Sequence, residues 1–233
     1  MNRVTLAVAG AVALLGTQLV GVAQAEVPLC GPPGEEVPAT IVGAGLIVGT
    51  SGDDVIVGSS GADTILAGGG NDTVCGEGGN DFVDGGLGDD ELIGDGINVP
   101  PFIPSNGAND DTLIGGPGDD TLAGVGGDDV LEGGPGFDTL IGFGGNDSIA
   151  GGPDDDSVFA GPLDDTVSGG PGNDTLFGNF GSDTISGGPG DDLLDGDNPF
   201  PPPPELPFPV GTNNDSCSSG PGDDVVLNCE SGA

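Results

Sequence analysis

The chain of 233 residues carries 39 acidic side chains against one basic side chain, Arg3, which gives a net charge of −38. Such a charge repels nucleic acid and anionic membrane surfaces, so neither is expected as a partner. With no His and no Lys, the usual Ser and Cys nucleophile systems cannot be built. We therefore do not expect an enzyme, although carboxylate-only chemistry of the glycosidase kind is the alternative in that class.

Residues 1–25 have the pattern of a secretory signal peptide. Arg3 supplies the positive end, Val4 to Val22 the apolar stretch, and Ala23-Gln24-Ala25 a small-x-small cleavage site. An uncleaved membrane anchor is the alternative, but no basic stop-transfer residue follows the apolar stretch. We expect cleavage after Ala25 and a secreted, extracellular product without membrane contact, whose mature chain has lost its only basic side chain.

Residues 26–48 are predicted to form an N-terminal cap segment, in which the apolar residues make an initial strand or cap: Ile41, Val42, Leu46, Ile47 and Val48. From residue 49 to residue 227 the chain then repeats the frame G-x-x-G-x-D-x-U-x, where U is apolar or cysteine. A chain with 51 Gly and 21 Pro would usually indicate disorder, but disorder does not keep an apolar residue in a fixed frame. The sixth position is aspartate in seventeen successive repeats: Asp54, Asp63, Asp72, Asp81, Asp90, Asp111, Asp120, Asp129, Asp138, Asp147, Asp156, Asp165, Asp174, Asp183, Asp192, Asp215 and Asp224.

Two segments interrupt the frame, at residues 97–108 and 199–212. Each fits inside a turn, because Gly94-Asp95-Gly96 opens a turn that Asn109-Asp110-Asp111 completes, and 196–198 with 213–215 do the same. The interruptions are therefore read as loops inserted into repeats six and sixteen. Since both numbers are even, both loops should leave from the same edge. Residues 228–233 are read as a C-terminal tail.

The frame predicts an all-β parallel solenoid. The Gly-rich positions one to six allow a sharp turn with positive φ, and the short strand that follows alternates its side chains between the two faces. Two repeats make one coil, so aspartates two repeats apart stack at about 4.8 Å, the spacing of neighbouring strands. Two unit charges at that distance repel by about 0.9 kcal/mol in water and by about 3.5 kcal/mol at an effective dielectric of 20. A row of aspartates stacked in this way needs cations to offset the repulsion.

The ligand atoms indicate which cation. They are oxygens only, which excludes the usual zinc and copper sites, since the chain has no His and its four Cys lie off the turns. Many ligands with flexible geometry and backbone carbonyls favour Ca²⁺ over Mg²⁺.

The frame resembles the haemolysin-type, or repeats-in-toxin (RTX), calcium-binding nonapeptide, over about residues 49–227. The resemblance implies a right-handed parallel β-roll of about seventeen repeats, with Ca²⁺ between turns i and i+2. It also implies that the sixth-position Asp is the side-chain ligand and that turn carbonyls complete the shell. Seventeen turns allow at most fifteen full calcium sites. Four repeats lack the fourth-position Gly and have Asn109, Asp154, Leu163 or Asn213 instead; the worst is Leu163, so sites around repeats eleven and twelve should be weak or altered.

The cysteines predict disulfide bonds in an oxidising compartment. Four cysteines allow three pairings, of which we favour Cys30–Cys75 and Cys217–Cys229; free buried thiols are the alternative.

The outward ninth position separates two outer faces, of which the odd-repeat face is mostly apolar. We expect residues 26–48 to cover its first part, held by Cys30–Cys75. The stripe Ile141, Phe159 and Phe177 would then be a contact surface, or reflect only the strand preference of such residues.

The sequence thus predicts a secreted protein that folds on binding several calcium ions and has a structural or surface-associated role. The alternative is an adhesin-like or ligand-binding module that uses the apolar face or the Pro-rich loops. Its partner would be an unknown cell-surface component or a second copy. Ice binding is disfavoured, because the Thr residues at the seventh position are divided between both sheets.

Overall fold

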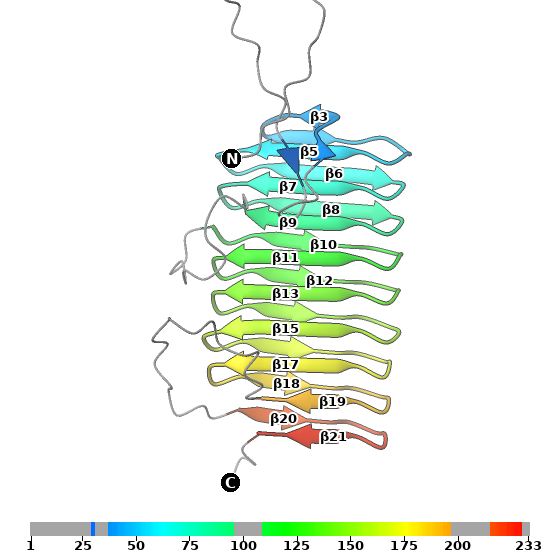
Figure 1. Cartoon of the computed structure of the whole chain (residues 1–233), viewed down its shortest axis with the longest axis vertical. Helices are drawn as coiled ribbons and strands as arrows, with labels where there is room; N and C mark the ends of the chain where they lie inside the picture. The colour runs from blue at the N-terminus through cyan, green and yellow to red at the C-terminus, as the bar shows by residue number, and fades with distance from the viewer. Residues whose placement is uncertain (1–28, 31–36, 96–108, 197–214, 230–233) are drawn as a thin grey trace, which may run out of the picture.

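The computed structural model describes residues 29–30, 37–95, 109–196 and 215–229. Within these ranges the regular structure is all β-strand, in two parallel sheets that wind together into a long solenoid (Figure 1). None of the described residues forms a helix long and apolar enough to span a membrane. The predicted signal peptide and the two predicted loops lie outside the described residues.

The two sheets contain alternate strands of the chain. The ten-stranded sheet consists of β3 (Ile41–Val42), β5 (Val55–Ser59), β7 (Thr73–Glu77), β9 (Glu91–Asp95), β11 (Thr121–Gly126), β13 (Thr139–Gly144), β15 (Ser157–Pro162), β17 (Thr175–Phe180), β19 (Leu193–Asp195) and β21 (Val225–Leu227). The nine-stranded sheet consists of β4 (Leu46–Val48), β6 (Thr64–Gly69), β8 (Phe82–Leu87), β10 (Thr112–Ile114), β12 (Val130–Glu132), β14 (Ser148–Ala150), β16 (Thr166–Ser168), β18 (Thr184–Ser186) and β20 (Ser216–Ser218). A small antiparallel pair, β1 (Leu29–Cys30) and β2 (Val37–Pro38), forms a third, separate sheet.

The strand register follows the nonapeptide frame. Every strand from β5 onward begins at the seventh frame position, and each pairs in parallel with the strand two repeats away, as Leu122 does with Leu140. The chain before the frame also joins the solenoid, because β3 pairs with β5 and β4 pairs with β6. Residues 41–48 thus cap the N-terminal end by extending both sheets. The parallel β-solenoid predicted from the frame is confirmed.

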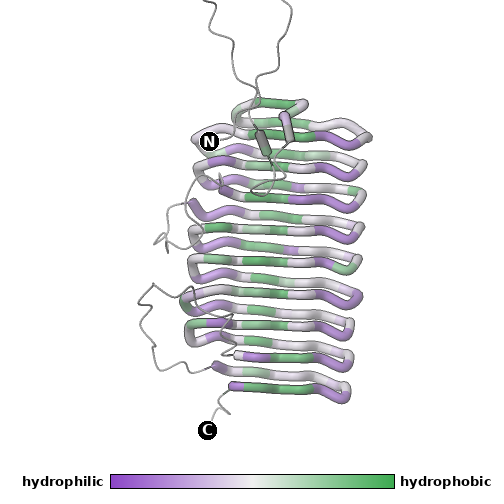
Figure 2. The backbone as a smooth tube through the Cα atoms, in the orientation of Figure 1, coloured by the Kyte–Doolittle hydropathy of each residue, from purple (hydrophilic) through white to green (hydrophobic). Residues whose placement is uncertain are grey.

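The core is a thin double row of eighth-position side chains. From Ile56 to Leu194 these side chains are at most 2% exposed, and they form one continuous cluster. Figure 2 shows it as a hydrophobic band running across the middle of the coils. The row ends at β21, where Val226 is 43% exposed. Since each fully buried aliphatic side chain contributes roughly 1.5–3 kcal/mol, the thin core must hold the coils largely through this one position.

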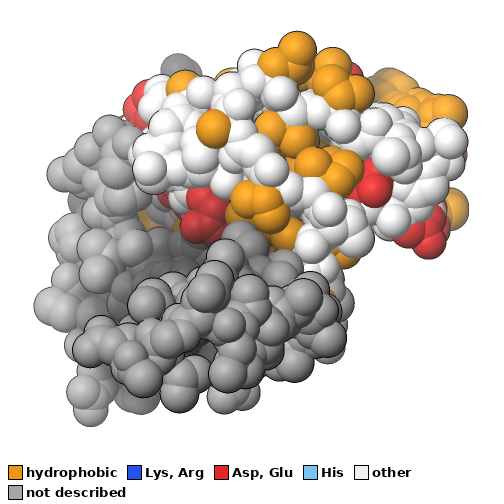
Figure 3. Space-filling view, turned by 90° about the horizontal axis from the view of Figure 1, so that it is seen from above, with side chains coloured by type: hydrophobic (Ala, Val, Ile, Leu, Met, Phe, Trp, Pro, Cys, Tyr) orange, Lys and Arg blue, Asp and Glu red, His pale blue; other side chains and the backbone are white. Residues whose placement is uncertain are grey.

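The N-terminal segment covers one end of the outer face of the ten-stranded sheet. Cys30 is fully buried and bonded to Cys75, and the two pack with Val57 and Ile93 in a second apolar cluster. Of residues 26–48, which are expected to cover this face, Cys30 is seen to pack there, and residues 26–28 and 31–36 lie outside the described residues. The N-terminal end of the solenoid itself exposes apolar side chains to solvent. Leu46 of β4 is 69% exposed, and Figure 3, which views the molecule from that end, shows apolar side chains on the surface.

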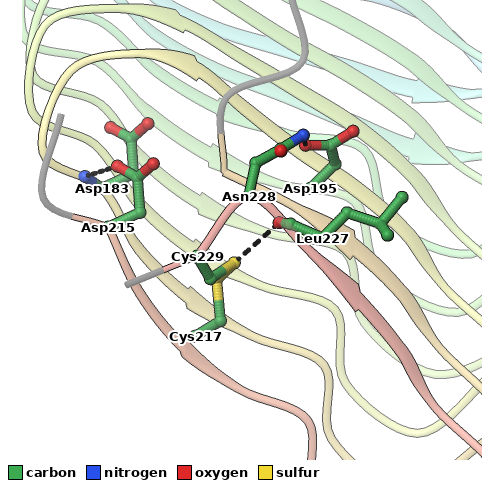
Figure 4. The surroundings of a disulfide bond; sticks show 7 residues. All are labelled: Asp183, Asp195, Asp215, Cys217, Leu227, Asn228 and Cys229. Carbon is green, nitrogen blue, oxygen red and sulfur yellow. Dashed lines mark hydrogen bonds between the residues drawn. A yellow bond between two sulfur atoms is a disulfide. The ribbon is translucent and has the colours of Figure 1, made fainter. Parts of the chain in front are cut away.

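At the C-terminal end the second disulfide joins Cys217 of β20 to Cys229, which follows β21 (Figure 4). Just before it, the Asn228 side-chain amide donates a hydrogen bond of 2.7 Å to Oδ1 of Asp195 on β19. Both disulfides are those favoured from the sequence, and the described cysteines include no free thiol.

Two valines at the same frame position of the same sheet test the core. Val158 is fully buried on β15, and Val226 is largely open on β21. We expect Val158→Ala to lower the free energy of unfolding by about 2 kcal/mol and Val226→Ala by less than about 0.5 kcal/mol, because only the first leaves a cavity. Denaturant unfolding in calcium-containing buffer measures both, and equal losses would contradict a core confined to this row.

Candidate calcium-binding turns

The turns of the solenoid form two edges that differ in sequence. The turns that follow strands of the nine-stranded sheet form the proline edge, named for its third-position residues Pro117, Pro135, Pro153, Pro171, Pro189 and Pro221. The turns that follow strands of the ten-stranded sheet form the insertion edge, because the two interruptions of the frame follow β9 and β19 of that sheet. In Figure 1 the insertion edge is on the left.

The sixth-position aspartates form one row along each edge. The proline edge has Asp54, Asp72, Asp90, Asp120, Asp138, Asp156, Asp174, Asp192 and Asp224. The insertion edge has Asp63, Asp81, Asp111, Asp129, Asp147, Asp165, Asp183 and Asp215. All but Asp224 are buried, which is unusual for carboxylates.

One carboxylate oxygen of each aspartate links two coils. The backbone N–H of Asp111 donates to Oδ1 of Asp129 at 2.8 Å, and the N–H of Asp129 donates to Oδ1 of Asp147 at 2.9 Å. The same bond recurs along both rows, and it crosses the insertions, as between Asp183 and Asp215. Each Oδ1 therefore faces the preceding coil, and the row is held by backbone donors without any cation.

The second oxygen, Oδ2, has no such donor in most coils. It is buried and has no hydrogen-bond partner in Asp72, Asp81, Asp90, Asp111, Asp120, Asp129, Asp138, Asp147, Asp156, Asp165, Asp174 and Asp192. Leaving one buried acceptor unsatisfied costs about 1–3 kcal/mol, and more for a charged group. A whole series of such atoms indicates that a further positively charged group belongs beside them.

The first-position glycine keeps the space beside Oδ2 open. A Cβ on Gly76 would lie 2.3 Å from Oδ2 of Asp81 and 2.5 Å from the carbonyl oxygen of Gly94 in the next coil. On the proline edge a Cβ on Gly115 would lie 2.4 Å from Oδ2 of Asp120. An anionic oxygen and a carbonyl oxygen of the next coil thus face the same small space, which a first-position side chain would narrow. The first-position exceptions to glycine in the frame are Ala67, Ala160 and Ser219.

Burial also raises the pKa of these carboxyl groups. Desolvation is the main cause, and repulsion from neighbouring aspartates adds to it in each case. The pKa rises to about 6 for Asp81, Asp90, Asp138, Asp147 and Asp174, to about 7 for Asp120 and Asp156, to about 8 for Asp111 and Asp129, and to about 9 for Asp165. A buried carboxylate must be balanced by a proton or by a cation.

These residues fit a calcium ion. The orphaned atoms are carboxylate oxygens, and the atoms facing them are backbone carbonyls, which is the hard-oxygen donor set that Ca²⁺ prefers. Among the described residues no three His, Cys, Asp or Glu side chains cluster tightly enough to hold an ion by themselves. The remaining ligands of each ion would therefore be backbone carbonyls of the turns.

Two of the four fourth-position exceptions keep the backbone conformation of a fourth-position glycine. Asp154 and Leu163 adopt φ values of 88° and 89°, the left-handed region usually left to glycine. Their N–H groups donate to carbonyl oxygens of the next coil, at 2.8 Å to Pro171 and 2.6 Å to Phe180. The backbone thus accommodates both residues at a conformational cost, and weaker calcium binding there stays a prediction.

A second ladder, at the fifth position, was missed from the sequence. Oδ1 of Asp53 accepts from the N–H of Asn71 at 3.0 Å, and Oδ1 of Asn71 accepts from the N–H of Asp89 at 3.2 Å. These exposed side chains face the following coil, opposite to the sixth-position row. The signal was available, because the fifth position is Asp or Asn in most repeats; Ala62, Phe137 and Ser182 are the exceptions.

Two further carboxylates lie on the insertion edge outside the sixth-position row. Glu77 and Asp95 occupy the second position of successive coils and pair in register. Burial raises the pKa of both, to about 6 for Asp95, whose Oδ1 accepts a hydrogen bond from the Asn109 side chain. The frame does not constrain the second position, so these two carboxylates could not be predicted from it.

The fold and its turns define a parallel β-solenoid made of nonapeptide repeats with buried carboxylate rows. The family model of the RTX calcium-binding nonapeptide repeat (4 copies) matches residues 48–83, 76–96, 105–140, 123–158 and 159–194. The chain belongs to this family, as its frame suggested. A search of curated proteins found no match.

The raised pKa values predict how the calcium-free protein responds to pH. A carboxyl group whose pKa rises from 3.8 to between about 6 and 9 on folding binds more protons when folded than when unfolded. Without calcium, the folded state should therefore lose stability as pH rises through this range. Circular dichroism in chelator should show more β-structure at pH 5 than at pH 8.5, with sedimentation as a control for association near the pI of about 4.1. A larger β-signal at pH 8.5 would contradict this.

Proposed function

We propose that this protein is a secreted calcium-binding repeat protein that folds on binding several Ca²⁺ ions and serves a structural or surface-associated role. The observation that carries the proposal is the series of buried, unpartnered Oδ2 atoms along both edges, most of which share the space beside a first-position glycine with a carbonyl oxygen of the next coil. Membership of a calcium-binding repeat family supports the same ion.

The charge balance supports several ions per chain. The only basic residue of the sequence is Arg3, so no basic side chain in the described part of the chain can neutralise the aspartate rows. Up to about fifteen ions between successive turns would contribute thirty positive charges against 39 acidic side chains. The sixth-position aspartates are the proposed side-chain ligands, and binding would be linked to folding because the turns assemble only when coils stack.

An extracellular location agrees with the two disulfides, which persist in oxidising compartments. Calcium is also abundant there, so sites with dissociation constants on the order of 10⁻⁴–10⁻³ M would be occupied. The proposed signal peptide at residues 1–25 gives the export route. We propose no catalytic role, no nucleic-acid partner and, after cleavage, no membrane contact.

A second candidate is an adhesin-like role, and one observation favours it. Phe159 and Phe177 stack on the outer face of the ten-stranded sheet, with ring centroids 5.1 Å apart, and both are only half-buried. A cell-surface component or a second copy could contact this stripe. The calcium-binding role remains the main proposal, because it accounts for the buried atoms of both edges.

Removal of calcium should unfold most of the chain. At pH 7.5 we expect excess chelator to abolish most of the β-sheet signal in circular dichroism, and calcium but not an equal concentration of magnesium to restore it, since the turn sites are flexible. A chain that stays fully β-structured in chelator would refute coupled folding.

Two neighbouring aspartates give a matched test of the ligand assignment. Asp129 has a buried, unpartnered Oδ2, whereas Asp128 is exposed in the same turn, and each retains an acceptor oxygen after substitution by Asn. We expect Asp129→Asn to lower the number of calcium ions bound per chain by at least one in isothermal titration calorimetry. Asp128→Asn should leave that number unchanged, and the same loss in both variants would contradict the assignment.

A further inference from the structure

The first two turns of the frame are built differently from the later ones. Their second positions are Thr50 on the proline edge and Ser59 on the insertion edge. Later turns have glycine there on the proline edge, and on the insertion edge mostly residues with positive φ, such as Glu77 and Val125. The Ser59 hydroxyl donates to the carbonyl oxygen of Gly61 at 3.2 Å and accepts from its N–H at 3.3 Å. Thr50 makes the same pair of bonds to Gly52, both at 3.2 Å. Each hydroxyl thus closes its own turn.

This closure redirects the second-position N–H toward the aspartate. The N–H of Thr50 donates to Oδ2 of Asp54 at 2.7 Å, and that of Ser59 donates to Oδ2 of Asp63 at 2.7 Å. In a later turn the equivalent N–H, that of Gly116, instead donates to a carbonyl of the next coil at 2.9 Å. The Oδ2 atoms of the first two turns therefore have a protein donor, which those of the following coils lack.

The Oδ2 atoms of Asp54 and Asp63 also lie farther from the first-position glycine than those of the later turns. A Cβ on Gly49 would lie 3.1 Å from Oδ2 of Asp54, and one on Gly58 would lie 2.8 Å from Oδ2 of Asp63. The corresponding distances in the later turns are 2.2–2.5 Å, as at Gly124 and Gly133. The oxygen thus leaves the space between coils and turns toward the backbone N–H.

The same end of the solenoid has cation-free support that the later coils lack. Strands β3 and β4 extend both sheets there, and the Cys30–Cys75 disulfide ties the N-terminal segment to β7. Cys30, Val57, Cys75 and Ile93 add apolar burial outside the main core.

We propose that the N-terminal end, from β3 to β6, folds without calcium and that calcium sites begin only with Asp72 and Asp81. Thr50 and Ser59 are the residues that make this difference, since they supply to Oδ2 an N–H in place of a cation. Two of the fifteen turn pairs, Asp54 with Asp72 and Asp63 with Asp81, then do not form calcium sites, which leaves at most thirteen sites. The preformed end is a template on which later coils add in order as calcium binds, as expected of a repeat array with nearest-neighbour contacts. This inference rests on the calcium-dependent folding proposed above.

Hydrogen exchange of the full chain, followed by mass spectrometry, tests the template. In chelator we expect backbone amides of residues 46–69 to stay protected at least tenfold over those of residues 121–186, and calcium to protect both regions. Equal, fast exchange of both regions in chelator would overturn the inference. Protection of the whole chain in chelator would contradict calcium-driven folding instead, and the calcium count described next then decides the N-terminal assignment.

A comparison of two aspartates on the insertion edge tests the site assignment directly. Asp63→Asn should leave the number of bound calcium ions unchanged, while Asp129→Asn lowers it by at least one, both measured by calorimetry. An equal loss in Asp63→Asn would overturn the inference. No loss in Asp129→Asn would count against the proposed function and not against the N-terminal turns. If Asp63→Asn does not fold, the exchange pattern of the unaltered chain still gives the answer.

Discussion

A carboxylate oxygen that is shut off from water and faces no donor must be balanced by a proton or a cation, and this solenoid repeats such an oxygen in coil after coil. The partner oxygen of the same carboxylate is fully used in holding the previous coil. One side chain therefore does two things at once: it links coils through the backbone, and it creates a demand for positive charge in the next gap. The chain cannot meet that demand from its own basic side chains, because its sequence contains only Arg3.

The other features of the fold follow from that arrangement. A Cβ at the first position would crowd Oδ2 in most turns, which explains why most of these positions are glycine. Glycine in turn raises the entropy that must be lost on folding, and the single apolar row offers limited compensation. Stability that a larger core would provide elsewhere must here come from the edges. The two disulfide bonds lie near the two ends of the solenoid, where the last coil has a neighbouring coil on one side only.

The parallel solenoid, its register and its core were predictable because one nine-residue frame fixes turn, strand and inward position together. The disulfides were predictable from the placement of four cysteines relative to that frame. The direction of each carboxylate was not, since Asp63 and Asp129 occupy the same frame position yet differ in the partner of Oδ2. That difference depends on the residue four positions earlier, Ser59 or Val125, and on the backbone φ it permits. At Leu163 the backbone does not follow the local preference of the residue. Leucine disfavours positive φ, yet Leu163 adopts it, and its N–H bonds to the adjacent coil.

The two edges are not interchangeable, and this sets the unit by which such a protein can change its length. Every ladder bond joins a residue to its counterpart one coil away, which is eighteen residues where no insertion intervenes. Loss or gain of eighteen residues would keep each remaining turn on its own edge. Loss of nine would move every later turn to the opposite edge and place the outer face of every later strand on the opposite sheet, so the ladders before and after the change would no longer match. Variation in length is therefore expected to proceed by pairs of repeats.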